Sequence, residues 1–222
     1  MRGGEGLTQA IEYNFFIDGD DVYVPFYNDC TATLRFNDET AVLEERSDYP
    51  YYGNTSFEVL KSSVKMAKKL KFFAPSWTQT EKITVYLNGK ACKTSFDHQF
   101  ITVESQLKTG DIIGFDLGLS VRTEDAVFKN SVKGYHKFCY GPMLLGYKTA
   151  TAINSLEGNS FENYAESKYK PAGKLKLAKN VKLVRQSKSE FAVADSSVIL
   201  SCLCDIKDLT KEDSMRQLLF KE

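Results

Sequence analysis

The feature that most constrains this chain is a succession of short runs in which inward and outward side chains alternate. In the first clear run, Val22, Val24 and Phe26 alternate with Tyr23 and Pro25. A period of two is that of a β-strand, whose successive side chains point to opposite faces of a sheet. We expect about twelve such strands, at Val22–Phe26, Thr31–Phe36, Thr40–Glu45, Ser56–Leu60, Lys69–Phe73, Ile83–Leu87, Gln99–Val103, Ile112–Val121, Tyr135–Tyr147, Leu175–Val184, Glu190–Val193 and Val198–Leu203.

Turn residues separate these runs. Asn88-Gly89 lies between two apolar runs, and this pair predicts a tight β-hairpin because both central residues of its turn need a positive φ. Asp18-Gly19-Asp20-Asp21 and Lys108-Thr109-Gly110-Asp111 are further turn signals. Many short strands with regularly spaced turns are typical of a β-sandwich. We therefore predict an all-β fold, a jelly-roll-like β-sandwich.

The two ends of the chain have a different pattern. Leu7–Phe16 has apolar residues at helical spacing, so residues 1–17 are expected to hold a short N-terminal helix. Residues 18–148 are expected to form the sandwich domain. Residues 149–222 are expected to be a C-terminal β extension, a second small β subdomain that packs on the sandwich.

Charge and hydropathy limit the classes of partner that this chain is expected to bind. The chain has 29 Lys and Arg residues and 29 Asp and Glu residues, so its formal net charge is zero. A nucleic-acid binder that works by releasing counterions needs excess positive charge, and we expect no nucleic-acid partner. No run approaches the ~18 apolar residues that span a bilayer, and no signal peptide is apparent. We expect a soluble chain without a membrane partner, and its compartment is not indicated.

The sequence contains no self-contained active-site motif and predicts neither catalytic nor metal-binding residues. Its five cysteines are scattered and its histidines number 2, which does not favour a zinc site. Asp18, Asp20 and Asp21 could bind calcium, but a solvated turn is the favoured reading. Glu44 and Glu45 could act as an acid–base pair, but neighbours on a strand point to opposite faces.

Aromatic residues are the candidates for a binding role. Tyr49, Tyr51 and Tyr52 cluster around Pro50, and Trp77 follows the strand end at Pro75. Exposed rings can stack on sugars, whereas buried rings fill the core of a sandwich. We name these three tyrosines and Trp77 as candidate carbohydrate-binding residues, with core packing as the alternative.

The order of several motifs resembles that of a known family. The chain contains LKFFAPSW at Leu70–Trp77, VYLNG at Val85–Gly89, KTGD at Lys108–Asp111 and YGPMLLG at Tyr140–Gly146. In this order they resemble the C-terminal β region of glycoside hydrolase family 127, the β-L-arabinofuranosidase-like enzymes. The resemblance extends to DDVYVPFY at Asp20–Tyr27, SDYP at Ser47–Pro50 and DSMRQLLF at Asp213–Phe220.

The resemblance implies that the chemistry lies outside this segment. The family's catalytic (α/α) barrel holds a zinc-bound cysteine nucleophile. Where the family has a Cys-Cys-x-Gly motif, this chain has Gly3-Gly4-Glu5-Gly6. Phe72 and Leu107 also replace an Arg and a Trp of the family pattern. No catalytic residue is therefore carried over, and no cofactor is expected in this chain, the family's zinc belonging to the barrel.

These observations lead to one expected function and two alternatives. The chain is expected to be the non-catalytic C-terminal β-sandwich portion of a β-L-arabinofuranosidase-like glycoside hydrolase, with its own catalytic barrel as partner. It is then a fragment, or it descends from a member without the cysteine pair. The first alternative is a stand-alone carbohydrate-binding module. The second is a structural or interaction domain that self-associates as a homo-oligomer.

Overall fold

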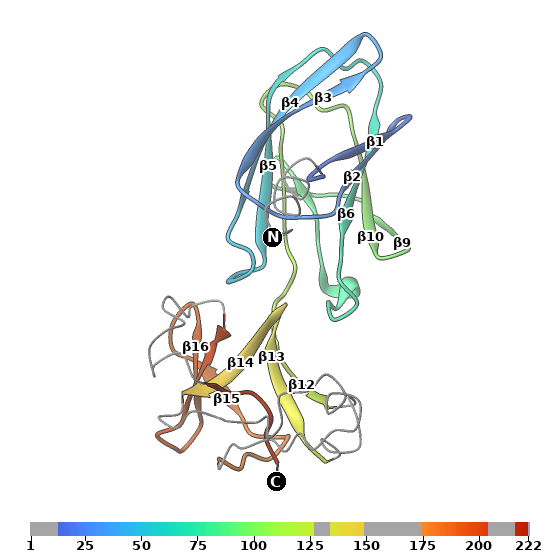
Figure 1. Ribbon diagram of the computed structural model, residues 1–222. Coiled ribbons are helices and arrows are strands. Elements are labelled where there is room, and N and C mark those ends of the chain that lie inside the picture. Colours follow the sequence, from blue (N-terminus) through green and yellow to red (C-terminus); the bar gives the residue numbers. More distant parts are fainter. Residues whose placement is uncertain (1–12, 127–133, 149–174, 204–215, 222) are drawn as a thin grey trace, which may run out of the picture. The chain divides into compact units, whose positions relative to one another are not determined.

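The computed structural model describes residues 13–126, 134–148, 175–203 and 216–221. The chain divides into two compact units, Met1–Leu119 and Ser120–Glu222 (Figure 1). The boundary expected from the sequence lies after residue 148. The described residues are nearly all β, and they contain no helix long and apolar enough to cross a membrane. The predicted all-β sandwich fold is confirmed.

The first unit contains two sheets, of which the first has five strands. Its order is β1-β2-β6-β10-β9. The pair β2 and β6 is parallel and the other neighbours are antiparallel. The strands are β1 (Phe16–Asp18), β2 (Asp21–Val24), β6 (Lys68–Phe73), β9 (Ser95–Asp97) and β10 (Phe100–Ser105).

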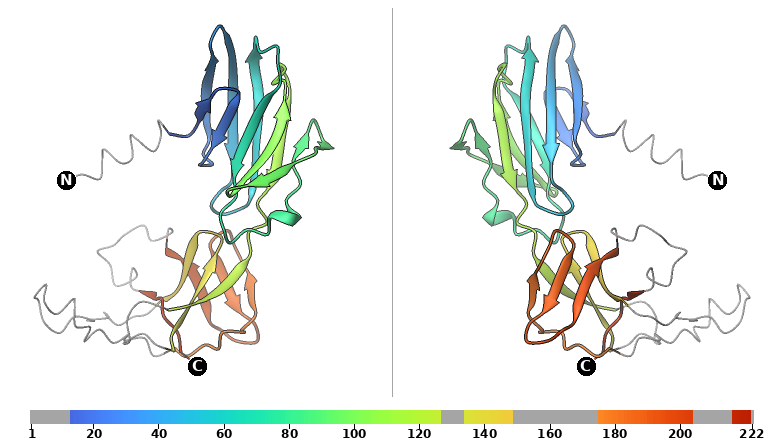
Figure 2. Two further views of the ribbon diagram at one scale, coloured as in Figure 1. Left: turned by 90° about the vertical axis from the view of Figure 1, so that its right-hand side faces the viewer. Right: turned by 90° about the vertical axis from the view of Figure 1, so that its left-hand side faces the viewer.

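The second sheet of this unit has six strands in the order β3-β4-β5-β11-β7-β8, all antiparallel. Its long strands lie side by side (Figure 2). A bulge interrupts the register between β4 and β5 at Val42 and Leu43. The strands are β3 (Cys30–Phe36), β4 (Glu39–Ser47), β5 (Asn54–Ser62), β7 (Tyr86–Leu87), β8 (Lys90–Ala91) and β11 (Ile112–Asp116).

The core of the first unit lies between its two sheets, because the alternating apolar residues of both sheets face each other. Three rings meet at its centre. The ring centroids of Phe57 and Phe72 are 5.0 Å apart, and those of Phe72 and Phe115 are 4.9 Å apart. The cluster also includes Val22, Val24, Leu34, Leu43, Val59, Leu70, Ile101, Val103 and Ile113.

The predicted hairpin is confirmed. Asn88 and Gly89 join β7 to β8 with φ angles of 52° and 76°, which the tight turn requires at both positions. The turn at Gly19 likewise joins β1 to β2, with a φ of 60°. A short 3₁₀ helix, η1 (Thr80–Lys82), follows β6.

The second unit contains one sheet in the order β12-β13-β14-β17-β16-β15, with β18 paired to β14. Its core is formed largely by the fully buried side chains of Phe138, Leu145, Leu200 and Phe220. The strands are β12 (Val121–Asp125), β13 (His136–Tyr140), β14 (Met143–Lys148), β15 (Leu183–Arg185), β16 (Glu190–Val193), β17 (Ile199–Cys202) and β18 (Arg216–Gln217).

Several expectations need correction. Most of the predicted strand Leu175–Val184 is not a strand, since β15 begins at Leu183. Residues 1–12 lie outside the described part, but Tyr13–Phe16 is not helical, because Phe16 already pairs with Tyr23 in the β1–β2 ladder. The predicted long strand Ile112–Val121 is two strands in different units, since β11 ends at Asp116 and β12 begins at Val121. A turn with Gly118 at a φ of 63° lies between them.

Candidate functional site

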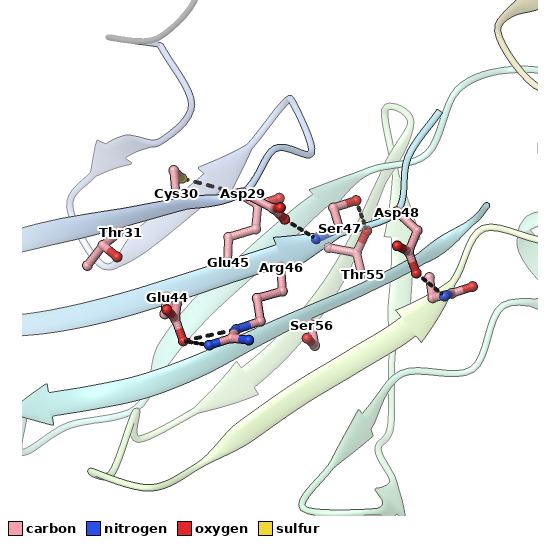
Figure 3. Close-up of a pocket in the computed structure, with 11 residues that line it drawn as sticks. Asp29, Cys30, Thr31, Glu44, Glu45, Arg46, Ser47, Asp48, Thr55 and Ser56 are labelled. Carbon is pink, nitrogen blue, oxygen red and sulfur yellow. Dashed lines mark hydrogen bonds and ion pairs between the residues drawn. The ribbon is translucent and has the colours of Figure 1, made fainter. Parts of the chain in front are cut away.

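A polar hollow lies over β3, β4 and β5, beside the loop that joins β4 to β5 (Figure 3). Its volume is about 630 Å³. Its walls are short polar and charged side chains, which come from neighbouring strands of the second sheet. The lining residues are Asp29, Cys30, Thr31, Glu44, Glu45, Arg46, Ser47, Asp48, Asn54, Thr55 and Ser56.

Glu45 is the most unusual of these residues, because only 1% of its surface is exposed. It continues the inward-facing series of Ala41 and Leu43 on β4. Its Oε1 accepts a hydrogen bond of 3.1 Å from the backbone N–H of Asn28. Burial raises the pKa of the Glu45 carboxyl to about 8, since a charge is costly away from water, and the charge of Asp29 adds to this shift. At neutral pH the carboxyl is therefore largely protonated.

Cys30 connects Glu45 to the segment that precedes β1. The Cys30 Sγ lies 3.7 Å from Glu45 Oε2 and 3.6 Å from Asn14 Nδ2. Asn14 Oδ1 in turn accepts a hydrogen bond of 3.1 Å from Asn28 Nδ2. These four residues form what we call the Asn14–Glu45 cluster. It ties the entry of the chain to β3 and β4.

The protonation states of the cluster do not favour nucleophilic chemistry. Burial raises the pKa of the Cys30 thiol, and the neighbouring Glu45 raises it further. A thiol must ionise to act as a nucleophile or a metal ligand, so this environment disfavours both roles for Cys30. Glu44 does not complete an acid–base pair, because its carboxylate binds Arg46 at 2.9 Å on the other face of β4.

The rim of the hollow is held by paired side chains (Figure 3). Asp29 Oδ1 accepts a hydrogen bond of 2.8 Å from the backbone N–H of Ser47. The hydroxyls of Ser47 and Thr55 are 2.8 Å apart, and Asn54 Nδ2 donates to Asp48 Oδ2 at 2.8 Å. These pairs fix the β4–β5 loop at its base.

The predicted sugar-binding aromatics do not share one surface role. Tyr49 packs edge-on against the buried Tyr27, with ring centroids 5.9 Å apart. Tyr51 is half-buried, whereas 44% of Tyr52 is exposed. Trp77 is half-buried in the turn after β6, and β6 belongs to the five-stranded sheet, not to the sheet that carries the tyrosines' loop. A carbohydrate-binding role for these four residues stays a prediction.

The other polar residues singled out in the sequence have structural partners. Asp20 and Asp21 bind Lys68 and Lys71, each at 2.5 Å. His136 is fully buried against Phe138, with ring centroids 5.2 Å apart. Cys204 lies outside the described residues. Within the described ranges, no group of three or more His, Cys, Asp or Glu side chains could hold a metal ion.

The sequence reasoning missed the burial of Glu45, although a signal for it was present. Glu45 stands two residues after Leu43 and four after Ala41, so the alternation of β4 already places it on the inner face. The hypothesis of an acid–base pair with Glu44 did not take this inward position into account.

A family comparison matches most of the first unit. Residues 21–119 match the sequence model of the family described as beta-L-arabinofuranosidase, GH127 middle domain. The matched range spans β2 to β11 and includes the polar hollow. The predicted placement in the C-terminal part of the family stays a prediction.

Solved structures with the same fold agree with this match. A GH127 beta-L-arabinofuranosidase from Geobacillus stearothermophilus T6 has a TM-score of 0.54 and 16% identity over 61% of this chain and 21% of that one. A second GH127 beta-arabinofuranosidase has a TM-score of 0.52 and 18% identity over 61% of this chain and 24% of that one. A protein described as a glycoside hydrolase has a TM-score of 0.69 and 16% identity over 97% of this chain and 38% of that one.

The similarity is limited to part of each solved structure. No curated protein matches the sequence. The chain spans between 21% and 38% of the length of the three solved structures. At 16–18% identity, these structures show a shared fold.

Proposed function

We propose, from the premise that residues 21–119 form a GH127-like region, that the chain is the non-catalytic β portion of a GH127-like glycoside hydrolase. In this role it supports a catalytic (α/α) barrel. The family match carries the proposal. It is supported by the solved relatives, which are much longer than the segment that this chain matches.

The described structure offers a surface suited to such a partner. Tyr13, Phe16 and Ile17, which we call the apolar edge, are 45%, 44% and 39% exposed. The rings of Tyr13 and Phe16 stack with centroids 5.4 Å apart. Phe15 between them packs inward against Phe57, and the Asn14–Glu45 cluster fixes the same segment. Exposed apolar side chains on an anchored segment favour contact with another protein surface.

The supporting role makes a prediction about activity. The purified chain, assayed on aryl β-L-arabinofuranosides with and without added zinc, is expected to give no turnover. Zinc-dependent turnover that is abolished by Cys30→Ser would overturn the non-catalytic role, because it would place a nucleophile in this chain.

A second experiment tests the contact with a barrel. The reading frame upstream of Met1 and its neighbouring genes are searched for an (α/α) barrel, which is then produced separately. The chain is expected to capture it, and Phe16→Asp is expected to weaken capture at least tenfold. Met66→Asp is the matched control, because Met66 is also exposed, at 71%, but lies outside the apolar edge. Absence of such a barrel, or of capture, would overturn the supporting role.

A further inference from the structure

A second hollow lies on the face of the first sheet that points away from the core. Its volume is about 970 Å³. The side chains of Tyr23, Lys71 and Thr102 line it, and they stand in one row across β2, β6 and β10. Their neighbours Val22, Leu70 and Ile101 face the core instead. Three central strands of the sheet therefore form the floor of the hollow, and the chain from Cys92 to His98, which includes the edge strand β9, forms a wall.

Aromatic rings form part of the hollow. The rings of Tyr23 and Phe100 meet edge to face, with centroids 5.4 Å apart and planes at 90°. Phe73 packs against Phe100, with ring centroids 5.7 Å apart. All three rings are half-buried, so each keeps some surface toward solvent. Rings held in this way offer a rigid apolar contact at little cost in side-chain entropy.

The polar groups around the rings are fixed and of balanced charge. Lys71 Nζ binds Asp21 at 2.5 Å and Tyr23 Oη at 2.9 Å, and it lies 4.5 Å from the centre of the Tyr23 ring. These contacts raise the pKa of Lys71, chiefly through the hydrogen bond to Asp21. The lining holds three lysines, Lys69, Lys71 and Lys93, and two carboxylates, Asp97 and Glu104. Asp21 lies beside the lining and supplies a third carboxylate through its ion pair with Lys71.

This combination points to a class of ligand. Equal numbers of cations and anions do not favour a strongly charged ligand. Rings flanked by amines, carboxylates and hydroxyls match a molecule with apolar faces and many hydroxyl groups. The volume of about 970 Å³ lies within the range of small-molecule sites, ~300–1,000 Å³.

We propose that this hollow binds a neutral pentose oligosaccharide. Phe100, held by Tyr23, contacts the apolar face of a sugar ring, and Thr102 and the hydrogen-bonded Lys71–Tyr23 pair contact its hydroxyls. The choice of sugar rests on the proposed function, since two of the solved relatives are described as arabinofuranosidases. The site itself is additional, because support of a barrel does not require it.

Titration of the full-length chain with arabino-oligosaccharides, followed by calorimetry and by NMR shifts, tests the site. We expect Phe100→Ala to weaken binding at least tenfold. Because Phe100 is half-buried, Thr102→Gln provides a second variant that fills the hollow from an outward position without removing core packing, and it is expected to weaken binding at least fivefold. Tyr52→Ala is the matched control, since it removes an exposed ring elsewhere and is expected to leave the affinity unchanged.

The outcomes separate this proposal from the supporting role. No binding at millimolar sugar by a folded chain would overturn the hollow and leave barrel capture untouched. Loss of binding in Tyr52→Ala but not in Thr102→Gln would overturn the proposal, because it would place the sugar-binding site at the β4–β5 loop. Tighter binding of an anionic oligosaccharide, weakened by salt, would overturn the neutral ligand. Loss of barrel capture in Thr102→Gln would show that protein, not sugar, covers this face.

Discussion

At the scale of single residues, Glu45 shows how one side chain can make stability depend on pH. It occupies the inward position that follows Ala41 and Leu43 on β4, so the strand buries it regardless of its polarity. The groups that face it are the backbone N–H of Asn28, the Cys30 thiol, the Asp29 carboxylate and the Tyr27 phenol. Of these, Asp29 further disfavours ionisation of Glu45.

The raised pKa of Glu45 predicts a fall in stability as the pH rises. In the unfolded chain the carboxyl loses its proton near its ordinary pKa of 4.5, whereas in the folded chain it keeps the proton up to about pH 8. The folded state thus binds more protons between these values, and the free energy of unfolding decreases across this window by a few kcal/mol. Glu45→Gln is expected to flatten this decrease, as measured by urea unfolding at pH 5, 6, 7 and 8.

Glu44→Gln is the control for this experiment. Glu44 is the next residue on β4, but it lies on the outer face and binds Arg46 at 2.9 Å. Its replacement is expected to leave the slope of stability against pH close to that of the natural chain. An unchanged slope in Glu45→Gln would show that Glu45 ionises normally in the folded protein.

At the scale of elements, a central strand and an edge strand of one sheet give phenylalanine different energetic roles. Phe72 on β6 is 1% exposed and packs among Phe57 and Phe115, whereas Phe96 on the edge strand β9 is 52% exposed. Phe72→Ala is expected to lower the free energy of unfolding by ~3–5 kcal/mol, because it leaves a cavity. Phe96→Ala is expected to cost about 0.5 kcal/mol or less in the same denaturant titration. Similar losses in both variants would contradict the assigned core.

Close backbone contact makes a second prediction for the elements. A Cβ on Gly53, just before β5, would lie 2.3 Å from Asp116 Oδ1 and 2.9 Å from the backbone nitrogen of Leu117. Gly53→Ala is expected to cost ~1–3 kcal/mol, because the β5–β11 pair must shift to relieve the clash. Gly114→Ala on β11 is the control, since its nearest contact is an ordinary 3.5 Å. The melting temperatures of both variants can be compared by thermal unfolding. A melting temperature of Gly53→Ala equal to or higher than that of Gly114→Ala would contradict this packing.

These elements also show how far the sequence could predict the structure. The alternation of apolar and polar residues predicted the sandwich strands, because a strand with one buried face has an apolar residue at every second position. It failed for Tyr13–Phe16, the end of the Leu7–Phe16 segment whose apolar spacing suited a helix, because Phe16 instead pairs with Tyr23. The two units divide at Leu119, where the apolar alternation of the sequence continues through the turn at Gly118. The hollow beside Tyr23 depends on strand order, since its row crosses β2, β6 and β10, which are distant in sequence.

At the scale of the whole molecule, the balance of charge bears on how copies of the chain interact. The formal net charge at pH 7 is zero, so long-range repulsion between copies is weak. The apolar edge lies at β1, the first strand in the order of its sheet. Edge strands and exposed apolar side chains are both prone to pair with other chains. The surface proposed to contact a barrel is therefore also the surface most suited to self-association.

The purified chain is accordingly expected to self-associate through the apolar edge as its concentration rises. Phe16→Asp should weaken this association at least tenfold in sedimentation velocity, because it places a charge beside the stacked ring of Tyr13. Met66→Asp, at a side chain 71% exposed, adds the same charge elsewhere and is expected to have little effect. Equal weakening by both variants would attribute the association to net charge rather than to this surface. If the barrel is added, it should compete with self-association, since both partners would cover Phe16.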